Sequence, residues 1–185
     1  MKKLILILFL ITNLSWAQDG ELFIYLNQYR NANNRESVKW SYKLDKISES
    51  QITKMYNADS VFHSNQNVYE CVLKGISVTP TISDKSDFAL FLKKNFNLEY
   101  KDPANTKNDN AVEKYILYYT IYMWDKEPTH RAIMLMDKVK EGSISLFIKS
   151  IKFKSNKVFI NGKVIEHKRI IDHYDCEWFA TLNLK

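Results

Sequence analysis

Apolar residues recur at three- and four-residue spacing in three early segments of the chain, 19–31, 41–57 and 84–96. This period places the apolar side chains on one face of a helix. The pattern therefore predicts three amphipathic helices in the first half of the chain. Asp19 and Ser41 open two of these segments and are available as N-terminal caps.

A fourth segment, 108–124, carries apolar and aromatic residues around most of its helical circumference. This distribution predicts a helix that is buried between other elements. Asn110 followed by Glu113 has the spacing of a capping box. Pro128 then interrupts the chain, and proline suits the first turn of a helix. Residues 128–135 are therefore predicted to form a short separate helix.

Strand patterns mark one internal segment and the end of the chain. Residues 67–77 are mainly apolar with β-branched members, and beyond Gly142 apolar residues alternate with polar ones. Both patterns are typical of strands. Asn161-Gly162 lies between two extended runs and is a strong hairpin signal. We expect residues 152–173 to form an inserted β-hairpin, peripheral to the main sheet.

Together these elements predict an α+β fold with a mainly antiparallel sheet. The chain of 185 residues is long enough for one domain with its own core. It opens with a lysine pair, an apolar run over 4–14 and a small-x-small sequence that ends at Ala17. This pattern predicts a signal peptide over 1–17 and a single mature domain over 18–185. We expect a secreted or periplasmic protein without a membrane span.

The charge is uneven along the chain. The net charge is +6, and the stretch from 138 to 169 contains nine basic residues and two acidic ones. A basic patch of this kind can attract anionic envelope polymers or lipid head groups. It can equally be the solvated side of a sheet. Nucleic acid is not an expected partner, because no motif that reads it is present.

Cys71 and Cys176 are the two cysteines of the chain. In an oxidising compartment an even pair favours a disulfide. Two buried free thiols are the alternative, since cysteine is often a core residue. The expected export favours the bridge, which we predict between the internal strand and the C-terminal strand.

Several motifs resemble, in order, those of one extracellular family. "LNQYRN" is similar to an HNxxR motif through Asn27 and Arg30, and "VKWSYKLDKISES" to an LxWxxxLxxxAxxxA helix through Trp40 and Leu44.

Three further stretches carry candidate chemistry. These are His63 in "FHS", Glu70 in "YECVLKG" where the family has GENxxxG, and His130 in "WDKEPTHRAIML", which is similar to WxxSPxHRxxIL. The order resembles the bacterial type of the CAP superfamily, the cysteine-rich secretory, antigen 5 and pathogenesis-related proteins, also called the SCP-like extracellular domain. Tyr69 and Cys71 depart from it, since glycine and asparagine flank the glutamate in the family.

The resemblance implies a three-layer α-β-α sandwich with a cleft lined by His63, His130 and Glu70. In some members such a cleft binds a divalent metal. Glu127 stands where eukaryotic members have a second glutamate, so it is a further candidate ligand. Two imidazoles and a carboxylate can supply three ligands to Zn²⁺ and leave a position for water; Mg²⁺ is the alternative ion.

Three functions remain open from the sequence. The first is a monomeric binding module, without turnover, whose cleft holds a metal or small ligand and whose partner is a protein, envelope polymer or lipid. The second is a metal-dependent hydrolase with His63, Glu70 and His130 as its catalytic candidates. The chain contains neither HExxH nor GxSxG, which weakens this alternative. The third is a carrier of a small apolar ligand or lipid.

Overall fold

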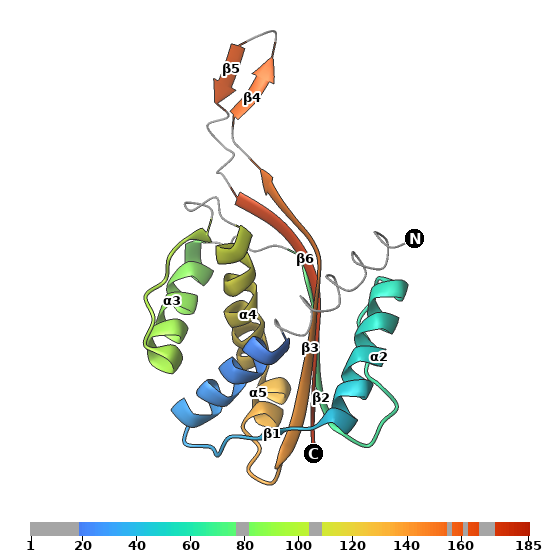
Figure 1. Cartoon of the computed structure of the whole chain (residues 1–185). Coiled ribbons are helices and arrows are strands. Elements are labelled where there is room, and N and C mark those ends of the chain that lie inside the picture. The colour runs from blue at the N-terminus through green and yellow to red at the C-terminus, as the bar shows by residue number, and fades with distance from the viewer. Residues whose placement is uncertain (1–18, 77–81, 104–108, 155–156, 161–162, 167–172) are drawn as a thin grey trace, which may run out of the picture.

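The chain folds into three layers, with helices on both faces of one sheet (Figure 1). The computed structural model describes residues 19–76, 82–103, 109–154, 157–160, 163–166 and 173–185. Helix α2 (Tyr42–Ala58) covers one face. The other face is covered by the first helix (19–32), α3 (Ile82–Phe96), α4 (Asp109–Lys126) and α5 (Pro128–Met134). The predicted α+β sandwich is confirmed, while the predicted signal peptide lies outside the described residues.

The sheet has the strand order β1-β3-β6-β2. Its members are β1 (Lys39–Trp40), β2 (Tyr69–Gly75), β3 (Glu141–Lys154) and β6 (His173–Leu184). β3 pairs with β6 and β6 with β2 in antiparallel fashion, whereas the short β1 runs parallel to β3. The sheet is thus mainly antiparallel, as predicted, and β2 lies at one edge.

The two faces of the sheet differ in polarity. Most of the apolar core lies on the side of α3, α4 and α5, where many aromatic rings pack together. Beneath α2 the apolar cluster consists of Ile52, Met55, Val72 and Phe179. Buried polar residues occupy the rest of that side: Ser48 Oγ lies 2.7 Å from Ser143 Oγ and accepts a bond from Asn183 Nδ2.

The helix termini differ from the caps expected from sequence. The Asp19 carboxylate is buried and accepts a hydrogen bond from Leu146 N at 2.7 Å, across the fold instead of within its own helix. Ser41 is the N-cap residue of α2, but its side chain makes no capping bond. Helix α4 begins at Asp109, so Asn110 lies inside its first turn. At Asp19 a tertiary contact therefore took precedence over the local capping signal.

A second, two-stranded sheet consists of β4 (Lys157–Ile160) and β5 (Lys163–Glu166). These strands pair in antiparallel fashion and stand clear of the three layers (Figure 1). They lie inside the segment 152–173 that was expected to be an inserted hairpin. The expected turn at 161–162 lies outside the described residues.

The predicted disulfide is wrong. Neither Cys71 nor Cys176 forms a disulfide, and both are buried. Cys71 on β2 is the register partner of Leu182 on β6, and Cys176 lies six residues farther along that strand. Six residues of extended strand span roughly 20 Å, far beyond the reach of a disulfide. The two strands are neighbours, as expected, but their register keeps the cysteines apart.

Candidate functional site

Three elements bring the predicted site residues together. Glu70 is the second residue of the edge strand β2. His63 lies in the loop that leads from α2 into β2, and His130 lies in the first turn of α5. The ring centroids of His63 and His130 are 6.5 Å apart, at an interplanar angle of 54°. The chain therefore brings together residues that are far apart in sequence, as the ordered motifs predicted.

Glu70 has a buried carboxylate that is only partly satisfied. Its Oε2 lies 3.0 Å from His63 Nδ1 and accepts a bond from Ser64 N at 2.7 Å. Its Oε1 is buried and has no hydrogen-bond partner among the described residues, and the same holds for Ser64 Oγ. A buried acceptor without a partner costs about 1–3 kcal/mol, so a donor or cation at this position would be stabilised.

His130 is less exposed than His63, whose side chain is 61% exposed. Burial lowers the pKa of His130, the nearby Glu127 opposes this effect, and His63 adds to it. The His130 imidazole is therefore predominantly neutral at neutral pH. A neutral imidazole keeps one nitrogen lone pair available as a ligand or hydrogen-bond acceptor.

Glu127 binds the start of its own helix. It is the N-cap residue of α5, and its Oε2 accepts a hydrogen bond from His130 N at 2.6 Å. This bond lowers the pKa of Glu127. The same oxygen lies 3.5 Å from His130 Nδ1. Glu127 is thus near the cleft, but its carboxylate is engaged in capping.

Cys71 also adjoins the site. Its Sγ donates to the backbone carbonyl of His130 at 3.7 Å. Burial raises the pKa of Cys71 well above the usual range, and the carboxylates of Glu127 and Glu70 raise it further. The thiol therefore stays protonated at neutral pH, which is the opposite of what a nucleophilic cysteine requires.

The donor set suits zinc in type, since imidazole and carboxylate are common zinc ligands. The unpartnered Glu70 Oε1 agrees with a cation between His63 and His130. As the side chains lie, however, no three His, Cys, Asp or Glu residues of the described part converge on one ion position. Binding through His63, Glu70 and His130 would therefore require a side-chain rotation, most readily by the exposed His63.

The motif residues Asn27 and Arg30 have structural roles. Arg30 is 1% exposed and donates to the carbonyls of Glu36, Met134 and Met136. Asn27 both donates to and accepts from the backbone of Val38. Arg30 thereby holds the end of α5, the helix that carries His130.

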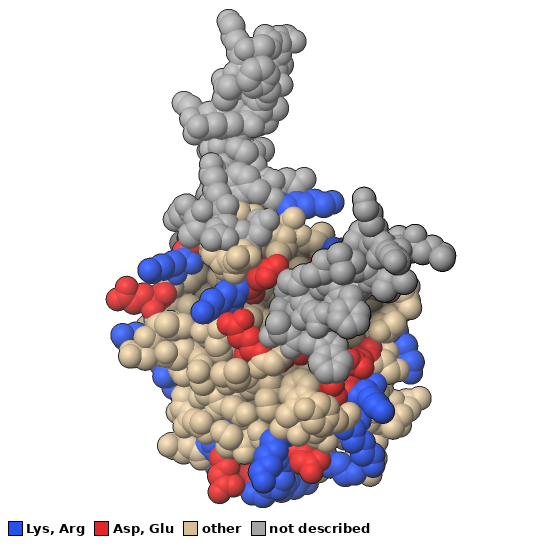
Figure 2. Space-filling model, in the orientation of Figure 1, with Lys and Arg blue, Asp and Glu red and all other residues tan. Residues whose placement is uncertain are grey.

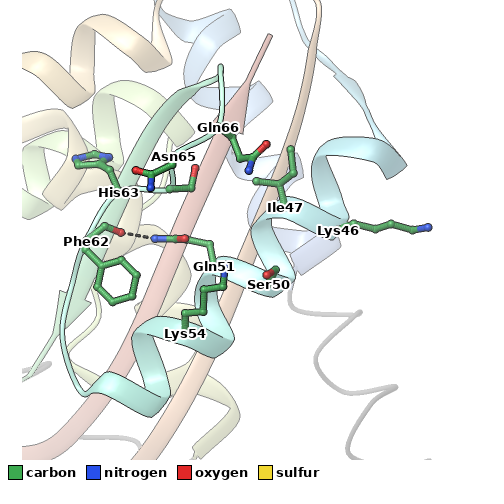
Figure 3. A pocket seen from close by; sticks show the side chains of 10 residues that line it. Lys46, Ile47, Ser50, Gln51, Lys54, Phe62, His63, Asn65 and Gln66 are labelled. Atoms are coloured by element: carbon green, nitrogen blue, oxygen red, sulfur yellow. Dashed lines mark hydrogen bonds between the residues drawn. The ribbon is translucent and has the colours of Figure 1, made fainter.

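A pocket of about 550 Å³, which we call the Gln51 pocket, adjoins His63 on the side of α2 (Figure 3). It is lined mainly by polar side chains of α2 and of the following loop, among them Gln51, Asn65 and Gln66. Sequence reasoning missed this pocket, because residues such as Asn65 and Gln66 look like ordinary loop residues. Gln51, a polar residue within the apolar pattern of the helix, was the available signal.

No family model and no curated protein matches the sequence. Among solved structures, the chain is similar to an outer surface protein from Borrelia burgdorferi. The two are 10% identical, with a TM-score of 0.48, over 91% of this chain and 92% of that one. Within the described residues, no helix has the length and apolar character needed to cross a membrane.

Proposed function

We propose that this protein is an exported binding module of the CAP type, whose cleft holds a divalent metal or a small polar ligand through His63, Glu70 and His130. The proximity of these residues, which come from separate elements, is the observation that carries the proposal: His63 Nδ1 lies 3.0 Å from Glu70 Oε2, and the ring centroids of His63 and His130 are 6.5 Å apart. The raised pKa of Cys71 keeps its thiol protonated, which argues against a role for this cysteine as a nucleophile. Export rests on the N-terminal sequence pattern.

A metal in this cleft would be Zn²⁺ in the first instance, held by the two imidazoles and the Glu70 carboxylate. Bound zinc would supply a Lewis acid and an acidified water. The residues of the chain would do the rest: His63 and His130 orient the ligand, and Ser64 N holds the Glu70 carboxylate in place. Hydrolysis with the same residues is the alternative outcome of this arrangement.

Calorimetric titration of the mature protein with zinc tests the proposal. We expect binding to weaken by at least about tenfold in both His63→Ala and His130→Ala, because each variant removes one ligand. His173→Ala is the matched control, because His173 lies ten residues along β6 from the register partner of Glu70. Unchanged binding in either cleft variant would contradict the pairing.

A carrier of small apolar ligands is the second candidate, and one observation favours it. A pocket of about 570 Å³ lies between α3 and α4, lined largely by apolar and aromatic residues that include Phe88, Leu98 and Tyr118. Apolar lining with a few polar groups is typical of small-molecule sites. The pocket lies on the opposite side of the sheet from α2, so it is separate from the Gln51 pocket.

Fluorescence of anilinonaphthalene sulfonate on binding can test the carrier function. Ala111 lines this pocket, and Ala111→Phe should fill it and reduce the fluorescence gain. Ala89→Phe, on α3 but outside the pocket lining, is the control. An equal gain in all three proteins would exclude this pocket as the binding site.

A further inference from the structure

The Gln51 pocket continues into a second pocket of about 550 Å³. The two pockets share Ile47 and Gln66, so they form one groove along α2. One wall of this groove is the outer part of α2, and the other is the loop between α2 and β2. We call this feature the α2 groove. Its length suits an extended ligand better than a single small molecule.

The charge of the α2 groove is strongly positive. Six lysines line it: Lys43, Lys46, Lys54, Lys138, Lys140 and Lys185. Glu141 is the one acidic residue among the lining residues. Figure 2 shows basic side chains, with a few acidic ones, gathered at the end of the molecule that carries the C-terminus. Such a groove raises the local concentration of anions.

Some of these lysines already contact other side chains, and others are available to bind an anionic ligand. Lys140 pairs with the exposed Glu36 at 3.1 Å, and Lys138 lies 4.8 Å from the ring centroid of Tyr69. Lys43 and Lys54 have no ion pair with an acidic residue of the described part. In Figure 3, Lys46 extends away from the other labelled side chains. Lys43 and Lys54 are therefore the cations best placed for a ligand.

Side-chain amides form the second feature of the groove. Gln51, Asn65, Gln66 and Asn67 line it, and the last three are exposed. Gln51 is 2% exposed and donates to the carbonyl of Phe62, so it ties the loop to α2 (Figure 3). Each amide offers both donors and an acceptor. Adjacent hydroxyl groups of a sugar need this combination.

We propose that the α2 groove binds an acidic polysaccharide, with lysines on its anionic groups and amides on its hydroxyls. A membrane surface fits less well, because lipid insertion needs a projecting apolar face and this groove is concave and carries six lysines. Single-stranded nucleic acid needs stacking rings, and Phe62 is the one phenyl ring among the lining residues. The inference rests on the proposed role as an exported binding module but needs no metal in the cleft.

Calorimetry of the mature protein with polygalacturonate at low salt, in EDTA, tests the inference. We expect binding that weakens as salt is added, because exposed charges are screened. Lys43→Gln and Lys54→Gln should each weaken it about two- to fivefold, as loss of an exposed ion pair does. Gln66→Ala, which affects both pockets, should weaken it by about two- to tenfold through lost hydrogen bonds.

The controls remove the same groups outside the groove. Lys94 lies on α3 and Gln28 on the first helix, both away from α2. The variants Lys94→Gln and Gln28→Ala should therefore bind polygalacturonate as tightly as the unmodified protein. Neutral dextran should bind far more weakly. Equal loss in groove and control variants, no binding, or tighter binding to single-stranded DNA or phosphatidylglycerol vesicles would each overturn the inference. Zinc titration of the same variants tests the cleft independently of the groove. Lys43→Gln should weaken polysaccharide binding and leave zinc binding unchanged.

Discussion

At the scale of single residues, Glu127 shows how a candidate ligand can instead be a cap. Its carboxylate accepts a bond from His130 N at the start of α5. Glu127→Ala should lower the free energy of unfolding by about 1 kcal/mol, as loss of an N-cap does. Zinc affinity should be unchanged, and Glu127→Asp should retain most of the stability. Urea unfolding and zinc calorimetry measure the two effects. Zinc affinity lost at full stability would assign Glu127 to the cleft instead.

Asp19 should make stability depend on pH in an unusual direction. Burial raises its pKa to about 7, with further contributions from Asp45 and Glu49, while its bond from Leu146 N opposes the rise. The folded chain therefore keeps a proton on Asp19 that the unfolded chain loses above about pH 4. Because protonation and folding are linked, the contribution of Asp19 to the free energy of unfolding falls as the pH rises from about 4 to 7. Above that range the contribution is constant.

The variant Asp19→Asn should lose this pH dependence of stability, and the amide oxygen of the new side chain can still accept the hydrogen bond from Leu146 N. Since one pKa unit corresponds to about 1.4 kcal/mol, the variant should be more stable at pH 8 by up to about 4 kcal/mol. Urea unfolding at pH 5 and pH 8 measures the difference. Asp137→Asn, at an exposed carboxylate, is the control. A variant that is less stable at both pH values would show that the Asp19 charge is favourable.

The proximity of His63, Glu70 and His130 was expected from the order of motifs that resembles the CAP superfamily; the apolar periods by themselves predicted only the helices and strands near these residues. The role of Glu127 was not predictable to the same degree. The predicted start of the helix at Pro128 made Glu127 a possible cap, but the resemblance made it a possible ligand, and only the direction of its side chain distinguishes the two roles. The Asp19 contact crosses 127 positions, so no local pattern encodes it.

At the scale of elements, Gly75 shows how closely β2 packs against its neighbour. A Cβ atom at this position would lie 2.1 Å from the Trp178 ring. Trp178 is 1% exposed, and its Nε1 donates to Thr120 Oγ1 at 3.1 Å, so the ring has little freedom to move. The contact between Gly75 and Trp178 follows from the register of β2 and β6, which no local sequence pattern encodes.

Gly75→Ala should therefore reduce the free energy of unfolding by about 1–3 kcal/mol through overpacking. In a Trp178→Leu background the same change should cost much less, because the ring is absent. Denaturant unfolding of the four proteins gives the coupling energy. Purely additive effects would show that the strain is not caused by the ring.

The β4–β5 sheet should be dispensable for folding. Lys154 and His173 are register partners, so an Asn-Gly turn can replace residues 155–172 directly. We expect the shortened chain to keep a single cooperative thermal transition, because the two short strands stand apart from the three layers. Loss of that transition would make the hairpin part of the core. The Asn-Gly signal and the alternating pattern were enough to predict extended structure here.

At the scale of the whole molecule, stability should not depend on oxidation. Cys71 and Cys176 form no disulfide, and they are buried and separated along the sheet. The melting temperature should be the same with and without reductant, and a thiol reagent should label both cysteines only after unfolding. A reductant-dependent melting temperature would restore the predicted bridge. Composition and expected compartment favoured that bridge, but the strand register decides it, and register depends on long-range pairing.

The position of β6 also governs when the molecule can fold. β6 lies between β3 and β2, yet it follows β2 by about a hundred residues in the chain. Until β6 has been synthesised, β2 has no strand to pair with and the sheet lacks the strand that joins β2 to β3. The sheet is therefore completed in a late step of folding, because pairings between strands far apart in sequence form slowly. In that step β6 joins β2 and β3 at once, so a change that weakens β6 should slow the formation of the whole sheet.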